Sequence, residues 1–524
     1  MKKVIFPKDW IQLQPYEVAD MTDQYYTNIA NQIYEIIMTA GYDKYFDTKD
    51  EVKHLALCIA AYFEDVISQT KIWETFTEEC KRRYGKYIPF YTDENTEYYP
   101  DEINEADIKF LLWHHAQYSI MDDRVLNPIF GRLDFTAQKI YSLLEKEYET
   151  APENERFHNA ICNEDGVDTD FDRYRELLIW FHNHCYFNIG NIERVKEQIE
   201  ATIENDTDFF DEVNNFQLMA TATCIDSIME GRDNLLSLTT LEWFKLICKK
   251  HPKCKQWAEV EMQTGLFEVK KEKSGLFIIN NLIDNKAKEI TVAKDTLPAQ
   301  LLATFQKKKT VLFTTFIKFG EHWITTGSFM DTDLANKSDF EKMQGIILEE
   351  RDRLTHKQTI QNYKMLKKGL KGKAANPIVI VKDDELMRKF FKDALGLNLK
   401  ANYTVPKELA NKKGIVIIGT PYIGIAPYYG IADLLAIPNN PYYNEELAKK
   451  RGFNIIVNAA SLPYEMACRL IDIGALKDAA LEIIDNSRQD WEDSHKMTQD
   501  NIQFITDYHF QKCRDKDMPL GELW

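Results

Sequence analysis

The stretch DEVKHLALCIAAYFEDVI, residues 50–67, indicates how the first half of the chain folds. Its apolar side chains recur every three or four residues, at Val52, Leu55, Ile59, Tyr62 and Val66. This spacing places them on one face of an α-helix, so the stretch predicts an amphipathic helix with a buried face. The same period continues through the neighbouring segments 22–41, 106–121, 134–149, 170–186, 191–203, 207–229 and 239–262. Residues 1–262 therefore predict an acidic helical domain.

The apolar period changes after residue 262. Short runs rich in β-branched and aromatic residues alternate with turn-forming residues, at 265–271, 275–279, 288–292, 310–317 and 322–326. Such runs are typical of β-strands. Five short strands in about 65 residues predict a small antiparallel β-barrel over 263–332, because closure removes the exposed edges of a small sheet.

The remaining chain mixes helical and strand-like patterns. Residues 333–374 predict a basic linker helix, and residues 375–524 predict a mixed α/β domain with C-terminal helices. Strands are expected in this last part at 378–381, 415–418 and 423–425, and helices at 383–395, 461–474 and 487–511. The predicted fold class is therefore multi-domain α+β: a large all-α N-terminal domain, a small antiparallel β-barrel and a mixed α/β C-terminal domain.

Charge is distributed unevenly along the 524 residues, whose formal net charge is −18. Residues 1–250 hold 25 basic and 47 acidic side chains, whereas residues 251–524 hold 40 and 36. Residues 351–400 alone hold 13 basic and 5 acidic side chains. The acidic half is either a solvated helical surface or a surface that attracts a basic segment or partner.

The basic segment carries the candidate binding residues. Most of its cations recur at helical spacing, and the predicted set is Arg353, Lys357, Lys364, Lys367, Lys368 and Lys371. A shared face of this kind can follow phosphate groups and bind them in a salt-dependent manner. Tyr363 is the one aromatic residue among them, so base stacking is not expected. The alternative is a solvated face, or one that the acidic half covers.

Cysteine and histidine suggest one candidate metal site, at Cys248-x2-His251-x2-Cys254. Tetrahedral zinc needs four ligands, usually in two paired half-sites. The chain has no second half-site of the Cys-x-x-Cys or His-x-x-x-His type. A helix end with a cationic last turn is therefore the favoured interpretation.

Three Glu-x-x-His pairs have the spacing found in di-iron helical bundles. They are Glu51/His54, Glu155/His158 and Glu492/His495. Their positions in a first helical turn, an irregular segment and an apolar stripe argue against a shared ion, so no metal site is predicted from them.

Two further groups of histidines suggest chemistry but favour core packing. His182 and His184 are two residues apart and point to opposite sides of a helix. His114-His115 precede Asp122-Asp123, and histidines near carboxylates can act in acid–base catalysis. His115 continues an apolar stripe, however, so no catalytic residue, metal ligand or cofactor is predicted.

Location is predicted from three absences in the sequence. The first residues contain no apolar segment typical of a secretory signal, and no apolar run is long enough to span a membrane. The nine cysteines are odd in number and scattered, which is typical of a reducing compartment. We therefore expect a cytoplasmic protein without a membrane partner.

Four motifs resemble those of an uncharacterised domain family of Bacteroidetes bacteria. They are PKDWIQLQPY at 7–16, YYTNIAN at 25–31, FLLW at 110–113 and EYETAPEN at 147–154. The resemblance implies a bacterial cytoplasmic protein, and it assigns no activity and no functional residue.

The leading functional hypothesis is a non-enzymatic macromolecule-binding or adaptor protein that acts through the predicted barrel and basic helix. Its partner is a protein or a nucleic acid. The alternative is a metal-dependent hydrolase with histidine ligands in the helical half, and a third possibility is a structural role in a complex.

Overall fold

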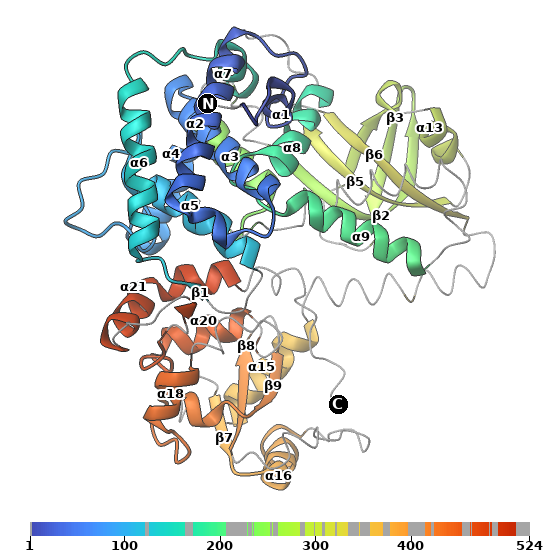
Figure 1. Cartoon of the computed structure of the whole chain (residues 1–524). Coiled ribbons are helices and arrows are strands. Elements are labelled where there is room, and N and C mark those ends of the chain that lie inside the picture. The colour runs from blue at the N-terminus through green and yellow to red at the C-terminus, as the bar shows by residue number, and fades with distance from the viewer. Residues whose placement is uncertain are drawn as a thin grey trace.

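The structure is a computed structural model, and it describes most of the helical and strand-forming segments (Figure 1). The described residues are 3–120, 125–162, 171–205, 228, 233, 235–251, 254, 260–282, 289–297, 299–306, 310–319, 322–333, 345, 357–369, 378–396, 414–420, 424–452, 462, 464–480, 483–484 and 491–509. They form a mixture of helices and antiparallel sheets, as expected for the α+β class.

The described residues up to Lys250 form the helical region. Its α-helices are α1 (Pro7–Ile11), α2 (Met21–Ala40), α3 (Lys49–Ser68), α4 (Ile72–Tyr84), α5 (Glu105–Ile120), α6 (Gly131–Glu147), α7 (Glu155–Cys162), α8 (Phe171–His184), α9 (Asn191–Asn205) and α11 (Thr240–Lys250). The helix expected at 207–229 lies almost entirely outside the described residues. The helix expected at 239–262 ends early, since His251 is extended before Pro252, and a residue before proline disfavours the helical conformation.

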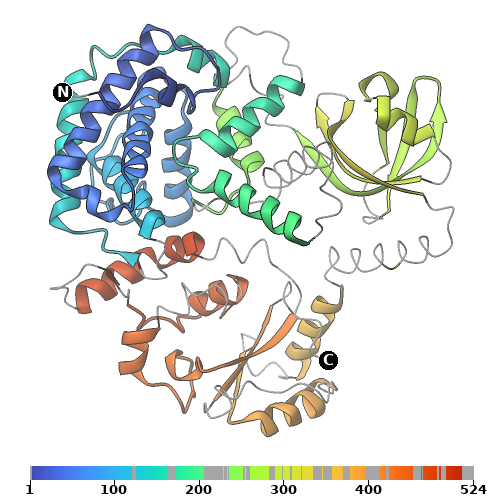
Figure 2. The same ribbon diagram turned by 45° about the vertical axis from the view of Figure 1, so that its right-hand side comes forward.

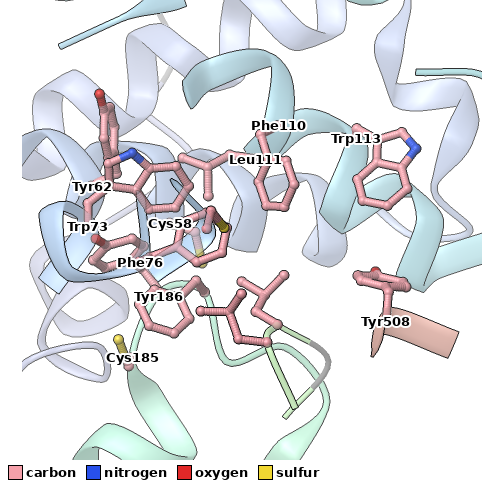
Figure 3. Packing of buried hydrophobic residues seen from close by; sticks show 14 of the residues in the cluster. Cys58, Tyr62, Trp73, Phe76, Phe110, Leu111, Trp113, Cys185, Tyr186 and Tyr508 are labelled. Atoms are coloured by element: carbon pink, nitrogen blue, oxygen red, sulfur yellow. The ribbon is translucent and has the colours of Figure 1, made fainter. Parts of the chain in front are cut away.

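The core of the helical region is largely aromatic. The rings of Trp73 and Phe76 on α4 are 4.9 Å apart, and Phe76 is 5.3 Å from Phe110 on α5. Phe110 is in turn 5.7 Å from Trp113. Figure 3 shows these side chains between their helices, with Tyr508 beside Trp113. Buried aromatic side chains of this size dominate the apolar area that a core removes from water.

A five-stranded antiparallel sheet follows. It contains β2 (Glu261–Lys273), β3 (Leu276–Asn281), β4 (Ile290–Ala293), β5 (Thr310–Phe319) and β6 (His322–Asp333), in the order β4-β3-β2-β5-β6. All five predicted strands are present. No closed barrel is found among the described residues, because β4 and β6 are the unpaired ends of this order.

Helix α13 (Ala299–Gln306) contributes to the apolar cluster of this sheet. Its residues Leu301 and Phe305 are buried in one apolar cluster with Phe277 and Phe316 of the sheet. The Phe305 ring is 5.3 Å from that of Phe277. The helix therefore covers apolar side chains of the sheet.

The C-terminal part contains a three-stranded antiparallel sheet of β7 (Ile378–Val381), β8 (Ile415–Thr420) and β9 (Gly424–Tyr429). Helices α15 (Lys357–Gly369) and α16 (Asp384–Leu395) bury Leu366, Met387 and Phe391 against Ile415 and Ile417. The alternate residues Val416 and Ile418 belong to the larger core that includes the helical region. The sheet is therefore apolar on both faces.

The last described helix packs back on the helical region. Helices α18 (Glu445–Arg451), α20 (Tyr464–Asp472) and α21 (Trp491–His509) follow the three-stranded sheet, and α21 lies beneath the helical region (Figure 2). The Phe504 ring of α21 is 5.5 Å from Phe90 and 5.9 Å from Phe110.

A pair of two-residue strands adds a second link between the helical region and the C-terminal part. Strand β1 (Val125–Leu126) pairs in parallel with β10 (Ile483–Ile484). The four-domain layout stays a prediction. Buried residues of the helical region and of the C-terminal part belong to one apolar cluster. No helix in the described part is long and apolar enough to span a membrane.

Candidate functional sites

Helix α15 presents part of the predicted basic face to solvent. Leu366 is fully buried and anchors the helix, whereas Lys364, Lys367 and Lys368 are exposed. Lys357 is the first residue of α15, and Arg353 and Lys371 lie outside the described residues. The structure thus describes an amphipathic helix with an exposed face that includes three of the six predicted cations.

The three exposed lysines have no acidic counterpart among the described residues. None of them forms an ion pair there, and Lys367 Nζ lies 5.6 Å from the centre of the Tyr363 ring. By contrast, three lysines in or directly after strands of the five-stranded sheet are paired with glutamates, in Lys270–Glu289, Lys294–Glu272 and Lys318–Glu261. The exposed face of α15 therefore keeps a positive charge that the paired lysines of the sheet do not.

The sequence suggested that the five-stranded sheet and the basic helix form one binding surface, but the two lie apart. Helix α15 packs on α16 and the strands β8 and β9, and Figures 1 and 2 show it apart from the sheet β2–β6. The sequence could not show this division, because it depends on pairing between residues 378–381 and 415–418.

The histidines of α3 and α5 lie side by side. The His115 ring is 5.8 Å from His54 and 6.0 Å from His114. His114 Nδ1 is 2.9 Å from Tyr508 Oη, and burial lowers the pKa of His114 to about 4. Burial also lowers the pKa of His115 well below its usual value, and desolvation by the surrounding chain lowers that of His54. Neutral imidazoles are therefore favoured at all three positions near pH 7.

The carboxylates predicted beside these histidines are placed elsewhere or not described. Glu51 Oε2 accepts a hydrogen bond of 2.6 Å from Ser119 Oγ, and Asp122 and Asp123 lie outside the described residues.

The other candidate histidines have partners in the chain. His182 Nδ1 is 2.7 Å from Thr240 Oγ1, and burial lowers the pKa of His182 to about 4. His495 Nε2 is 2.6 Å from the Lys477 carbonyl oxygen.

No metal site is assembled in the side-chain positions that the structure gives. Across the described residues, no group of three or more His, Cys, Asp or Glu side chains is arranged to hold a metal ion. The hydrolase alternative therefore gains no ligand set from the described histidines, and it stays a prediction.

Two fragments considered separately in the sequence meet in the core. His158 and Cys162 of α7 lie against His251, with Cys162 Sγ 3.5 Å from His251 Nε2 and 3.7 Å from His158 Nδ1. The Cys254 thiol donates to the Ile161 carbonyl over 3.3 Å. The relevant sequence signal was His158-x-x-x-Cys162, a spacing that places both side chains on one helix face.

Two adjacent buried carboxylates on α3 were missed by sequence reasoning. Glu64 accepts hydrogen bonds from Gln14 Nε2 (2.8 Å) and Asn154 Nδ2 (2.7 Å), and burial raises its pKa to about 8. Asp65 is also buried, which raises its pKa. An acidic pair at the end of an apolar helix was the available signal, but such pairs usually mark an exposed helix end.

Asp65 organises the turn between α3 and α4. It accepts hydrogen bonds from the backbone nitrogens of Ile72 (3.2 Å) and Trp73 (2.7 Å), from Tyr186 Oη (2.7 Å) and from the Thr70 hydroxyl. The adjoining hollow, which Gln69 and Lys71 help to line, has a volume of about 10 Å³. That volume suits about one water molecule and no organic ligand, so this carboxylate is structural.

Comparison with known families finds one match that covers most of the chain. The family described as "Protein of unknown function (DUF3843)" matches residues 4–330 and 321–511. The chain belongs to the DUF3843 family. This confirms the resemblance to an uncharacterised domain family, while a Bacteroidetes source stays a prediction. No curated protein and no solved structure matches this DUF3843 chain.

Proposed function

We propose that this DUF3843 protein is a bacterial cytoplasmic binding protein that contacts nucleic acid through the exposed face of α15. The observation that carries the proposal is the exposure of Lys364, Lys367 and Lys368 without an acidic counterpart among the described residues. Lysines in this state can neutralise phosphates and release counterions, which favours binding.

The packing of α15 supports the proposed orientation. Leu366 holds the helix on Ile415 and Ile417 of the three-stranded sheet, so the lysines face away from that sheet. Contacts from this helix would be made to phosphates and not to stacked bases, since Tyr363 is half-buried beside Lys367. The proposal therefore expects weak sequence preference and strong salt dependence.

The test is fluorescence anisotropy with a labelled DNA duplex, titrated with the full chain at several salt concentrations. The triple variant Lys364→Glu, Lys367→Glu and Lys368→Glu should abolish binding. In the corresponding alanine variant, the slope of log affinity against log salt should become shallower by about 3.

A matched control keeps the total change in charge constant. Lys139, Lys146 and Lys196 are exposed on α6 and α9 of the acidic half, and their triple glutamate variant should bind DNA as the wild type does. Equal binding by the α15 variant and the wild type, or no binding by the wild type at low salt, would contradict the proposal. Capture of an acidic protein instead of DNA would also contradict the nucleic-acid assignment.

A further inference from the structure

The strand order of the five-stranded sheet is informative because its first strand lies in the middle. Strand β2 pairs with β3 on one side and with β5 on the other, and β4 and β6 lie at the two ends. Helix α13 stands between β4 and β5 in the chain (Figure 1). Five antiparallel strands connected in this way, with a helix between the third and the fourth, have the connectivity of the oligonucleotide/oligosaccharide-binding (OB) fold in its partly open form.

Two details of the sheet agree with this connectivity. The pairing of β2 changes partner along its length, since residues 261–268 pair with β5 and residues 267–273 pair with β3. A register shift between Val269 and Lys271 marks a β-bulge, which bends a strand. Strands β4 and β6 have Cα atoms within 8 Å of each other, although they form no ladder among the described residues. The sheet therefore curves so that its two end strands come close.

The curved sheet has an inner and an outer face. Phe277 and Ile279 of β3 point inward, into the apolar cluster to which α13 contributes. Side chains alternate along a strand, so Leu276, Ile278 and Asn280 point outward, where they are half-buried. OB folds bind ligands on the outer face of the second and third strands, beside the loop that joins the first and second. The corresponding surface here consists of β3, β4 and the turn between β2 and β3.

Two lysines of β2 lie on this outer surface. Lys271 is in register with Ile278, and Lys273 is in register with Leu276. Both lysines are exposed, and neither forms an ion pair with a described residue. Residues two apart on one face of a strand are about 7 Å apart, a separation that suits successive phosphates of an extended chain. Glu268, an acid on the same face, lies on the other side of the bulge.

Other acidic side chains near these lysines are already paired. Glu272 pairs with Lys294 and is in register with an inward side chain of β3, whereas Glu289 pairs with Lys270. The outer surface beside the turn therefore keeps two positive charges next to half-buried aliphatic side chains.

We propose that the outer face of β2, β3 and β4 binds single-stranded nucleic acid beside the turn between β2 and β3. An extended single strand exposes phosphates along one side and bases along the other. Lys271 and Lys273 fit the phosphates, and the half-buried Leu276 and Ile278 fit the apolar surface of the sugars and bases. The described outer side chains of β3 and β4 include no aromatic residue, so the contacts favour modest affinity without sequence preference.

The proposal goes beyond the contact made by α15 and does not depend on it. The two surfaces lie apart (Figures 1 and 2). A duplex keeps its bases stacked inside, so the aliphatic side chains of the sheet gain little contact from it. We therefore expect the sheet to bind single strands in preference to duplexes.

The first test is fluorescence anisotropy of a labelled oligothymidylate of about 16 nucleotides, titrated with the full chain at low salt. The double variant Lys271→Glu, Lys273→Glu should bind at least about tenfold more weakly than the wild type. In the double alanine variant, the slope of log affinity against log salt should become shallower by about 1.4.

The control for this test is the double variant Lys139→Glu, Lys146→Glu, which changes the charge by the same amount on α6. It should bind the oligothymidylate as the wild type does. Equal binding by the wild type and the Lys271→Glu, Lys273→Glu variant, or no binding by the wild type, would overturn the proposal.

Hydrogen exchange locates the bound strand and separates this surface from α15. The oligothymidylate should slow amide exchange in the turn 273–276, both in the wild type and in the triple variant Lys364→Glu, Lys367→Glu, Lys368→Glu. Absence of this protection in the wild type, or its loss in the α15 variant, would overturn the proposal. Binding of the duplex by α15 is measured separately, so failure of either proposal can be recognised independently of the other.

Inorganic polyphosphate is the competitor that separates nucleic acid from polyanions in general. At equal phosphate concentration it should displace the oligothymidylate less effectively, because it offers no sugars or bases to the aliphatic side chains of β3. Equal displacement would overturn the assignment of nucleic acid to this face.

Discussion

Glu64, Asp65 and Asp107 of the helical region are fully or almost fully buried, whereas several charged side chains at the five-stranded sheet form surface pairs such as Lys318–Glu261. Each buried carboxylate is held by several donors; Asp107, for example, accepts from Tyr62 Oη (2.6 Å) and Tyr98 Oη (2.7 Å). The surface pairs remain partly hydrated. The comparison indicates that buried polar groups specify how the helices pack in the helical region. The charged pairs of the five-stranded sheet mainly keep its surface hydrated.

The largest expected effect follows from removing the acceptor between α3 and α4. Asp65→Ala leaves two backbone nitrogens, Tyr186 and Thr70 without their partner, so the free energy of unfolding should fall by about 4 kcal/mol. Urea unfolding followed by circular dichroism measures this change. Asp65→Asn keeps an acceptor oxygen and should lose less; equal losses in both variants would contradict the role of hydrogen bonding.

The packing of α21 on the helical region gives the next largest effect. Phe504 is 1 % exposed and its ring contacts Phe90 and Phe110. Phe504→Ala should lower the free energy of unfolding by about 3 kcal/mol, because it leaves a cavity in the shared core. Leu386→Ala on α16 is the control, since Leu386 is 44 % exposed. A loss no larger than that of the control would show that α21 does not stabilise the helical region.

The buried Glu64 makes the stability of the helical region depend on pH. Its native pKa is about 8 and its ordinary value is 4.5, so between these values the native state keeps a proton that the unfolded state releases. The free energy of unfolding should therefore fall as pH rises from 4.5 to 8, by about 2.5 kcal/mol between pH 5.5 and 7.5. Above pH 8 this group contributes no further decline.

Glu64→Gln is the matched variant for that prediction, because its neutral amide does not titrate. The urea midpoint of the variant should vary less between pH 5.5 and 7.5 than that of the wild type. An identical pH profile for the two proteins would assign the dependence to other groups, among them Asp107, whose burial raises its pKa to about 6.

The smallest effect belongs to the sheet surface. Lys318 Nζ is 2.8 Å from Glu261 Oε1, and the two side chains are 37 % and 63 % exposed. Lys318→Ala should change the free energy of unfolding by less than about 0.5 kcal/mol. A loss comparable to that of Asp65→Ala would remove the contrast between the two regions.

The sequence predicted the elements well where one simple period governs them. The apolar stripe of residues 50–67 became α3, and the runs at 265–326 became the five strands of the sheet. Helix α13 was missed because LLATFQ, within residues 301–306, is too short for a helical period to emerge. Its residue Phe305 packs on Phe277 of the sheet.

The candidate sites were less accessible to sequence reasoning. The exposure of Lys364 and Lys368 followed from helical periodicity. The burial of Glu64 did not follow, because an apolar pattern predicts that a carboxylate is exposed. The pattern contains no information on the side-chain amides of Gln14 and Asn154, which donate hydrogen bonds to Glu64. The partnership of Cys162 with His251 depends on packing between distant segments, which no local spacing contains.

The pairing of β1 with β10 has a consequence for synthesis on the ribosome. Val125 and Ile483 are about 360 residues apart along the chain, and at 5–20 residues per second translation of that interval takes roughly 20 to 70 seconds. Throughout this time the apolar side of α5, including Trp113, has been made while its partners Phe504 and Tyr508 have not. We therefore expect the nascent helical region to expose an apolar face, the kind of surface that chaperones bind, until α21 has been synthesised.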